Sequence, residues 1–148
     1  MKPTLKTLVM SAAVGLVLAA GAATGGDAKS DLAHLKGTWV RELDGKTYIF
    51  TFNGEKFASV SEFAEGTTTT TGTITIDPTK KPKHVDFTFT DGTGRGEKLQ
   101  GKTALNIYQL DGDTLKICGR RPLGRCEAFP DKEVVEGEYL YLVFKRAK

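Results

Sequence analysis

The feature that most constrains the fold of this chain is a regular alternation of apolar and polar residues. Val85, Phe87 and Phe89 alternate with polar residues, and Ile74 and Ile76 do the same further upstream. A period of two places the apolar side chains on one face of a pleated strand. The recurring residue types (Thr, Val, Ile, Phe and Tyr) also favour strands. The pattern therefore predicts half-buried β-strands.

Four dipeptides that favour tight turns separate the apolar runs: Asp44-Gly45, Asn53-Gly54, Asp91-Gly92 and Asp111-Gly112. Gly, Asn and Asp tolerate the positive φ that short hairpin loops require. No stretch after Leu35 has a helical period. Short strands joined by tight turns are typical of an antiparallel meander, so we predict that topology. The expected strands are 37–43, 46–53, 56–64, 67–77, 84–91, 103–110, 114–119 and 138–146. A twisted sheet of about eight strands tends to close and lose its edges, so we expect an all-β, antiparallel, up-and-down eight-stranded barrel.

The run of threonines from Thr67 to Thr71 has two interpretations. Such a tract can be disordered or glycosylated. The favoured interpretation is a strand leading into Ile74 and Ile76, because threonine is β-branched and prefers pleated structure.

The N-terminus has the three regions of a secretory signal. Lys2 and Lys6 precede an apolar run over 8–20, and Ala20-Gly21-Ala22 matches a cleavage site with small residues. The alternative is an uncleaved membrane anchor, but a spanning helix needs about 20 apolar residues and this run is shorter. We predict a signal peptide over 1–22, export to the periplasm or the extracellular space, and no stable membrane span after cleavage.

The region after this signal divides into a lead-in and a domain. Residues 23–34 are expected to form a flexible lead-in and a short helical turn, with Ser30 as the N-cap. The barrel domain is expected over 35–148. The whole chain has 21 basic and 18 acidic residues. Loss of Lys2 and Lys6 with the signal would leave the domain nearly neutral, which argues against nucleic acid as a partner.

Two cysteines, Cys118 and Cys126, flank a short segment of this chain, for which export is predicted. Thiols tend to oxidise outside the cytoplasm, so a disulfide between them is the favoured expectation. The alternative is two unpaired thiols, because the sequence does not show how closely their Cα atoms approach.

Two short motifs resemble the lipocalin arrangement. Lys36-Gly37-Thr38-Trp39 stands at the start of the first predicted strand, and Lys145-Arg146 at the end of the last. In lipocalins a Gly-x-Trp motif opens the first strand, and a basic residue from the last strand packs over the indole. The resemblance implies a structural role for Gly37, Trp39 and Arg146 at the closed end of a lipocalin-like barrel, where a guanidinium can lie on the indole face.

Further segments resemble an exported lipocalin-like domain family of unknown function found in planctomycete-type bacteria. In that family an Arg-Pro pair is soon followed by Phe, whereas here an insertion containing Cys126 separates Arg121-Pro122 from Phe129. The resemblance implies fold and export but no activity. It is carried by residues 35–39, Asp77-Pro78, 81–86, the distinctive 107–118 segment and Arg121-Pro122.

Motifs of catalysis and metal binding are absent from the sequence. Neither Gly-x-Ser-x-Gly nor His-Glu-x-x-His occurs, and His34 and His84 have no local nucleophile or paired carboxylate. Asp111-Gly112-Asp113 lacks the further ligands of a calcium loop and is interpreted as a hairpin turn. We therefore expect no enzyme activity, no catalytic residues, no metal and no cofactor.

Two functions fit a barrel of this size, whose interior holds either packed side chains or one small ligand. The first is binding of a small hydrophobic molecule. The second is a filled barrel that acts as an extracytoplasmic interaction or structural module, with an envelope protein as its partner. A cavity of a few hundred Å³ would favour the first. The candidate ligand-binding residues are Tyr48, Phe50, Phe52, Phe87, Phe89 and Tyr108.

The last predicted strand, 138–146, is apolar on both of its faces. Only one of these faces can point into the barrel. We expect the other to be covered by the N-terminal turn or by a partner.

Overall fold

The computed structural model describes residues 27–148 of the chain. The predicted signal peptide over 1–22 and the first part of the predicted lead-in lie outside the described residues. Within the described range, no helix is both long enough and apolar enough to cross a membrane.

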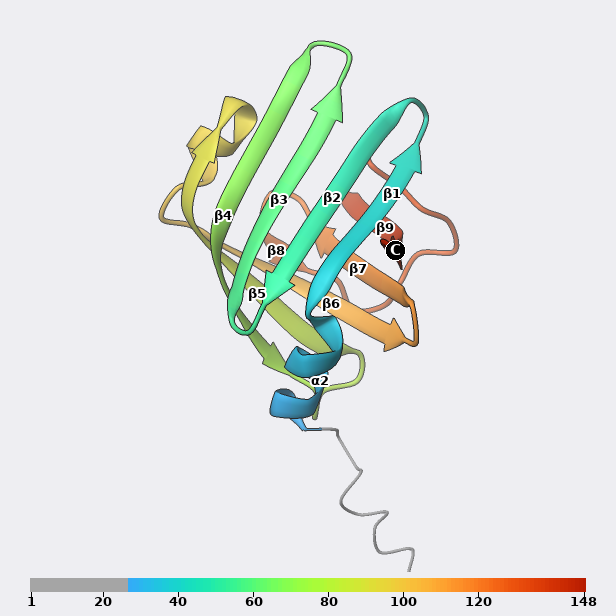
Figure 1. Ribbon diagram of the computed structural model, residues 1–148. Helices are drawn as coiled ribbons and strands as arrows, with labels where there is room; N and C mark the ends of the chain where they lie inside the picture. The colour runs from blue at the N-terminus through green and yellow to red at the C-terminus, as the bar shows by residue number, and fades with distance from the viewer. Residues whose placement is uncertain (1–26) are drawn as a thin grey trace, which may run out of the picture.

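A single antiparallel sheet closes on itself into an eight-stranded barrel (Figure 1). Strands β1 to β7 pair in sequence order, and β9 closes the barrel by pairing with both β1 and β7. The predicted up-and-down, lipocalin-like architecture is thus confirmed, and the sequence did not indicate the short β8. The strands are β1 (Gly37–Leu43), β2 (Lys46–Asn53), β3 (Lys56–Phe63), β4 (Gly66–Asp77), β5 (Lys83–Thr93), β6 (Thr103–Asp111), β7 (Thr114–Arg120), β8 (Gly124–Arg125) and β9 (Tyr139–Arg146).

Three of the four predicted turn dipeptides form hairpin turns. The exception is Asp91-Gly92, which lies inside β5, and the connection is made instead by the 3₁₀ helix η1 (Gly94–Leu99). A Cβ on Gly92 would lie 2.3 Å from the carbonyl oxygen of Gly96. The glycine is therefore needed for a close approach between two backbone segments, and the prediction of a turn there was wrong.

The threonine run forms part of β4, as predicted. Two of its hydroxyls, one on each face of the sheet, pair with hydroxyls of neighbouring strands. The Thr70 and Ser59 hydroxyls are 2.6 Å apart, as are those of Thr69 and Thr93. These cross-strand pairs stabilise the β3–β4–β5 part of the barrel.

A two-turn helix, α2 (Ala28–Leu35), covers one end of the barrel (Figure 1). It begins earlier than predicted. Asp27 is the N-cap, and its carboxylate accepts a hydrogen bond of 3.0 Å from the Lys29 backbone N–H. Ser30 lies inside the helix, so its assignment as N-cap was wrong. Aspartate is as good a cap as serine, and the earlier start places both Asp31 and Leu35 against the barrel, where both are buried.

The end of the barrel beneath α2 is closed by Trp39, which is fully buried. Its indole N–H donates a 2.8 Å hydrogen bond to the carbonyl of Leu35. The Arg146 guanidinium lies over the indole, 4.2 Å from the ring centroid, as the lipocalin resemblance implied. Gly37 has φ +125°, and a Cβ there would lie 3.2 Å from Arg146 Nη1, so the glycine leaves room for the stacked guanidinium.

The outer face of β9 is covered by the chain's own segment 126–138. Phe129 packs on Tyr141 with ring centroids 5.4 Å apart, and Val134 forms a β-bridge with the same tyrosine. The Glu133 carboxylate accepts a 2.7 Å hydrogen bond from the Val143 backbone N–H. The expectation that the N-terminal turn or a partner covers this face was therefore wrong, because a long loop with no regular period supplies the cover.

Cys118 and Cys126 lie in a hydrophobic cluster with Ile107 and Tyr141, and both cysteines are buried. Their Sγ atoms are 2.6 Å apart and the thiols are free, whereas a disulfide bond is about 2.05 Å long. The short intervening loop does bring the cysteines together, but the predicted disulfide is not formed. Burial, followed by the contact with Cys126, raises the pKa of the Cys118 thiol, so the reactive thiolate is disfavoured.

Candidate functional site

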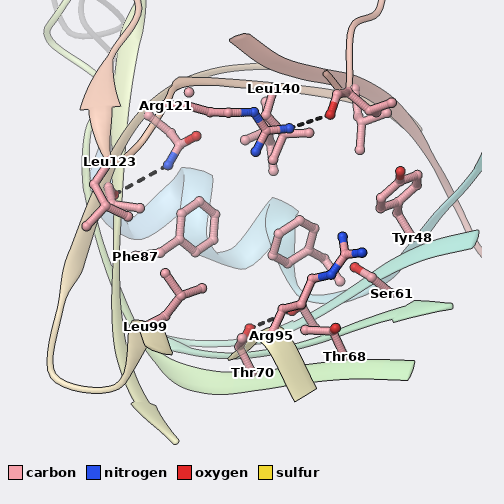
Figure 2. Close-up of a pocket in the computed structure, with 18 of the residues that line it drawn as sticks. Tyr48, Ser61, Thr68, Thr70, Phe87, Arg95, Leu99, Arg121, Leu123 and Leu140 are labelled. Carbon is pink, nitrogen blue, oxygen red and sulfur yellow. Dashed lines mark hydrogen bonds between the residues drawn. The ribbon is translucent and has the colours of Figure 1, made fainter. Parts of the chain in front are cut away.

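The barrel contains a cavity of about 540 Å³ that opens at the end away from α2. This position follows from the strand directions. Lys46 begins β2, Phe63 ends β3 and Arg121 follows β7, and all of these chain positions lie at the open end. Figure 2 shows the side chains that surround the cavity. The volume is within the range of known small-molecule pockets.

Four of the six predicted ligand-binding residues line this cavity: Tyr48, Phe50, Phe87 and Phe89. Phe50 stands at the centre of its apolar floor. Its ring centroid is 5.3 Å from that of Phe87 and 5.3 Å from that of Phe144 on β9. The floor is thus a packed aromatic cluster that offers ring faces and edges to a ligand.

Phe52 and Tyr108 do not line the cavity, although they share the inward face of their strands. Phe52 lies one inward position nearer the closed end than Phe50 and stacks beneath it at 5.5 Å. The Tyr108 hydroxyl bonds to Asp31 on α2. Both side chains belong to the packed lower half of the barrel, because that half is filled by α2 and Trp39.

One wall of the cavity carries hydroxyl groups that the sequence analysis missed. Ser59 and Ser61 on β3 and Thr68 and Thr70 on β4 all line it. A signal for this wall existed. On β3 the polar serines face inward while Ala58 and Val60, which alternate with them, face outward, reversing the polarity of an ordinary barrel strand. The wall offers hydrogen-bonding groups above an apolar floor.

Charged side chains gather at the mouth of the cavity. Arg95 on η1 forms an ion pair of 2.8 Å with Glu65 and lies 5.1 Å from the centroid of the Phe63 ring. The Lys46 ammonium lies 5.9 Å from the same centroid. The Phe63 ring thus makes cation–π contacts with two cations at the rim.

Arg121 is a further guanidinium at the mouth. Its side chain donates a hydrogen bond to the carbonyl of Val135, and its backbone N–H donates one of 2.7 Å to the carbonyl of Glu138. These bonds hold the arginine against the 126–138 segment. Figure 2 shows Arg121 and Arg95 approaching the cavity from opposite sides of the view, with Tyr48 at its right-hand side.

Tyr48 is the titratable group that is most enclosed in this cavity. Burial raises the pKa of its hydroxyl, and the positive charge of Arg121 opposes part of that shift. The phenol therefore stays neutral at physiological pH and can either donate or accept a hydrogen bond. Asp44 and Glu136 add to the rise in pKa, and Arg95 also opposes it.

The site offers binding groups and few reactive ones. The acidic residues that line it, Glu65 and Glu136, lie at the mouth, and its floor is apolar. Over residues 27–148, no group of three or more His, Cys, Asp or Glu side chains is arranged to hold a metal ion. Asp86 and His84 lie outside the cavity lining, and Asp86 pairs with Arg125 at 2.8 Å.

Comparison of the chain with protein-family models, with curated proteins and with solved structures gives no match.

Proposed function

We propose that this protein binds a small hydrophobic molecule inside its barrel. The observation that carries the proposal is the cavity of about 540 Å³ with an aromatic floor built around Phe50. An eight-stranded barrel can be filled completely by its own side chains, and this one is filled only in its lower half. The space that remains is concave, partly enclosed and mainly apolar, which favours a ligand site.

The second candidate, a module that acts only through its surface, has less support. Leu140 is the only exposed large hydrophobic residue in the part of the chain that the structure describes, and it lies at the mouth of the cavity. An interaction surface usually carries a larger apolar patch. We therefore propose that the protein binds its apolar ligand inside the barrel and that it does not catalyse a reaction.

We also propose that the protein is exported and belongs to the lipocalin-like family that it resembles. Support comes from the sequence: the basic start, the apolar run over 8–20 and the small residues at Ala20 and Ala22. The intact mass of the protein recovered from fractionated cells tests the export. A mass that matches cleavage after Ala22, found outside the cytoplasm, is the expected result.

Obstructing the cavity tests the binding proposal. Ser61 lines the cavity and Val60, its neighbour on β3, points outward, so Ser61→Phe should obstruct the cavity while Val60→Phe leaves it open. Native mass spectrometry of wild-type protein from its own host should show a bound mass that denaturation releases. Ser61→Phe should lose that mass and Val60→Phe should retain it, with thermal unfolding showing that both variants fold. A wild-type protein that takes up no apolar ligand would refute the proposal.

A further inference from the structure

We infer that the ligand of this cavity is an amphiphile whose anionic head group, a carboxylate or a phosphate, is held at the mouth by Arg121 and Arg95. The inference rests on the proposed function and specifies the class of ligand. It depends on three features of the site: the balance of charge at the mouth, the separation of apolar and polar groups along the cavity, and the anchoring of Arg121.

The charged side chains that line the cavity are mostly basic. Four basic and two acidic side chains line the cavity: Lys46, Arg95, Arg120 and Arg121, against Glu65 and Glu136. Arg120 is neutralised by Glu138 at 2.7 Å, and Arg95 shares its charge with Glu65. Over residues 27–148, neither Arg121 nor Lys46 forms an ion pair. An anion is therefore attracted to this opening, and a cationic head group is repelled.

Most polar groups of the cavity lie above its floor, although Phe63 and Leu140 also line the mouth. The floor is formed by Phe50, Phe87 and Phe144, the wall by serine and threonine hydroxyls, and the rim by guanidinium groups. A wholly apolar ligand would offer no polar partner to the Ser61 and Thr68 hydroxyls or to the Lys46 ammonium. A molecule with an apolar tail and a charged head matches both halves, because its tail is buried and its head stays near water.

Arg121 is held in place before any ligand arrives. Its hydrogen bonds to the Val135 and Glu138 carbonyls tie the residue to the 126–138 segment. Its positive charge also lies close enough to Tyr48 to oppose the rise in the pKa of that hydroxyl. A guanidinium has five N–H donors, so one bond to Val135 leaves donors for a carboxylate or a phosphate. Less conformational entropy is lost on binding when the arginine is already ordered.

Both arginines are exposed, so their contribution is screened by solvent. We therefore expect a preference of about fivefold to tenfold for an anionic head over a neutral one with the same tail. The preference should shrink at high ionic strength, as it does for other exposed charges.

Isothermal titration of the purified protein with three probes tests the inference: dodecanoate and dodecyl phosphate below their micelle concentrations, and dodecanol below its solubility limit. All three should bind, and at least one anion should bind more tightly than dodecanol. Arg121→Gln and Arg95→Gln should each lower that preference, and the double variant should remove it without weakening dodecanol binding. Lys56→Gln, which removes an exposed charge at the closed end, is the control and should change nothing.

The outcomes separate the inference from the proposed function. Equal binding of all three probes, or an anion preference that survives in the folded double variant, overturns the inference and leaves the hydrophobic cavity as a binding site. Failure of every probe to bind overturns both. Comparison of the two anions in the wild-type protein then distinguishes a carboxylate from a phosphate head group.

Discussion

The Tyr108 hydroxyl donates a 2.6 Å hydrogen bond to the Asp31 carboxylate and so ties the N-terminal helix to the barrel interior. Lys83 reaches the same oxygen at 2.9 Å, so the largely buried Asp31 has two donors. A buried carboxylate is costly unless it is paired and hydrogen-bonded, and both conditions are met here. The helix is thus fastened to β5 and β6 as well as to the strand that follows it.

Removing this hydrogen bond should destabilise the fold. We expect Tyr108→Phe to lower the free energy of unfolding by about 1–2 kcal/mol, because the carboxylate loses one donor in a buried site. Tyr139→Phe removes a hydroxyl for which no hydrogen bond is found within residues 27–148, and should cost less than about 0.5 kcal/mol. Urea denaturation of both variants makes the comparison. An equal loss of unfolding free energy in both variants would show that the hydrogen bond from Tyr108 to Asp31 does not stabilise the fold.

Stability should fall at high pH. Burial, followed by the hydrogen bond to Asp31, raises the pKa of Tyr108, and burial also raises the pKa of Tyr48 and of Tyr141. The folded protein therefore holds these protons more tightly than the unfolded chain does. Their contribution is complete below the ordinary tyrosine pKa of about 10 and is lost as the pH rises beyond it, by up to about 1.4 kcal/mol per pH unit for each group.

Unfolding free energies measured between neutral pH and about pH 11 test this dependence. The slope above pH 10 should be shallower in Tyr108→Phe than in the wild-type protein, since one of the linked groups is missing. An unchanged slope would mean that Tyr108 has the same pKa in the folded protein and in the unfolded chain.

The planar shape of the Arg146 guanidinium, and not only its charge, should stabilise the closed end of the barrel. Its guanidinium stacks on Trp39 and donates hydrogen bonds of 2.8 and 2.7 Å to the carbonyls of Lys36 and His34. Lysine cannot reproduce this fork, so Arg146→Lys should cost about 1–2 kcal/mol. Because this protein has one tryptophan, its fluorescence should report the change directly. Lys145→Gln, next in the strand and exposed, should leave both readouts nearly unchanged.

The two cysteines should behave as buried thiols. Intact mass should be the same with and without reductant, because no bond joins Cys118 to Cys126. A thiol-alkylating reagent should modify the folded protein slowly and both cysteines rapidly once it is denatured, since burial and a raised thiol pKa disfavour the thiolate of Cys118. A mass that increases on reduction would show that the protein is oxidised.

The strands and most of their turns could be predicted from the sequence because both depend on local interactions. Val85, Phe87 and Phe89 face inward on β5 as their alternation requires, and Asp44-Gly45 turns the chain as its residues favour. The location of Trp39 and Arg146 at the closed end was implied by the resemblance of two short motifs, at opposite ends of the domain, to lipocalins. Asp91-Gly92 does not form the predicted turn, because Gly92 is needed for a close approach to the backbone of Gly96 in η1.

The binding site itself depended on how the barrel closes. Period two shows that Phe50 and Phe52 share a face, but only the packing of α2 and Trp39 leaves one of them at the cavity and buries the other. The serines of β3 line the cavity because closure turns their face inward, and Arg121 reaches its mouth because 126–138 folds back on β9. The sequence alone thus determined a closed antiparallel barrel, through local backbone preference and alternation. Tertiary structure decided which end is filled, which is hollow and which charges surround the opening, because these depend on contacts between residues far apart in the chain.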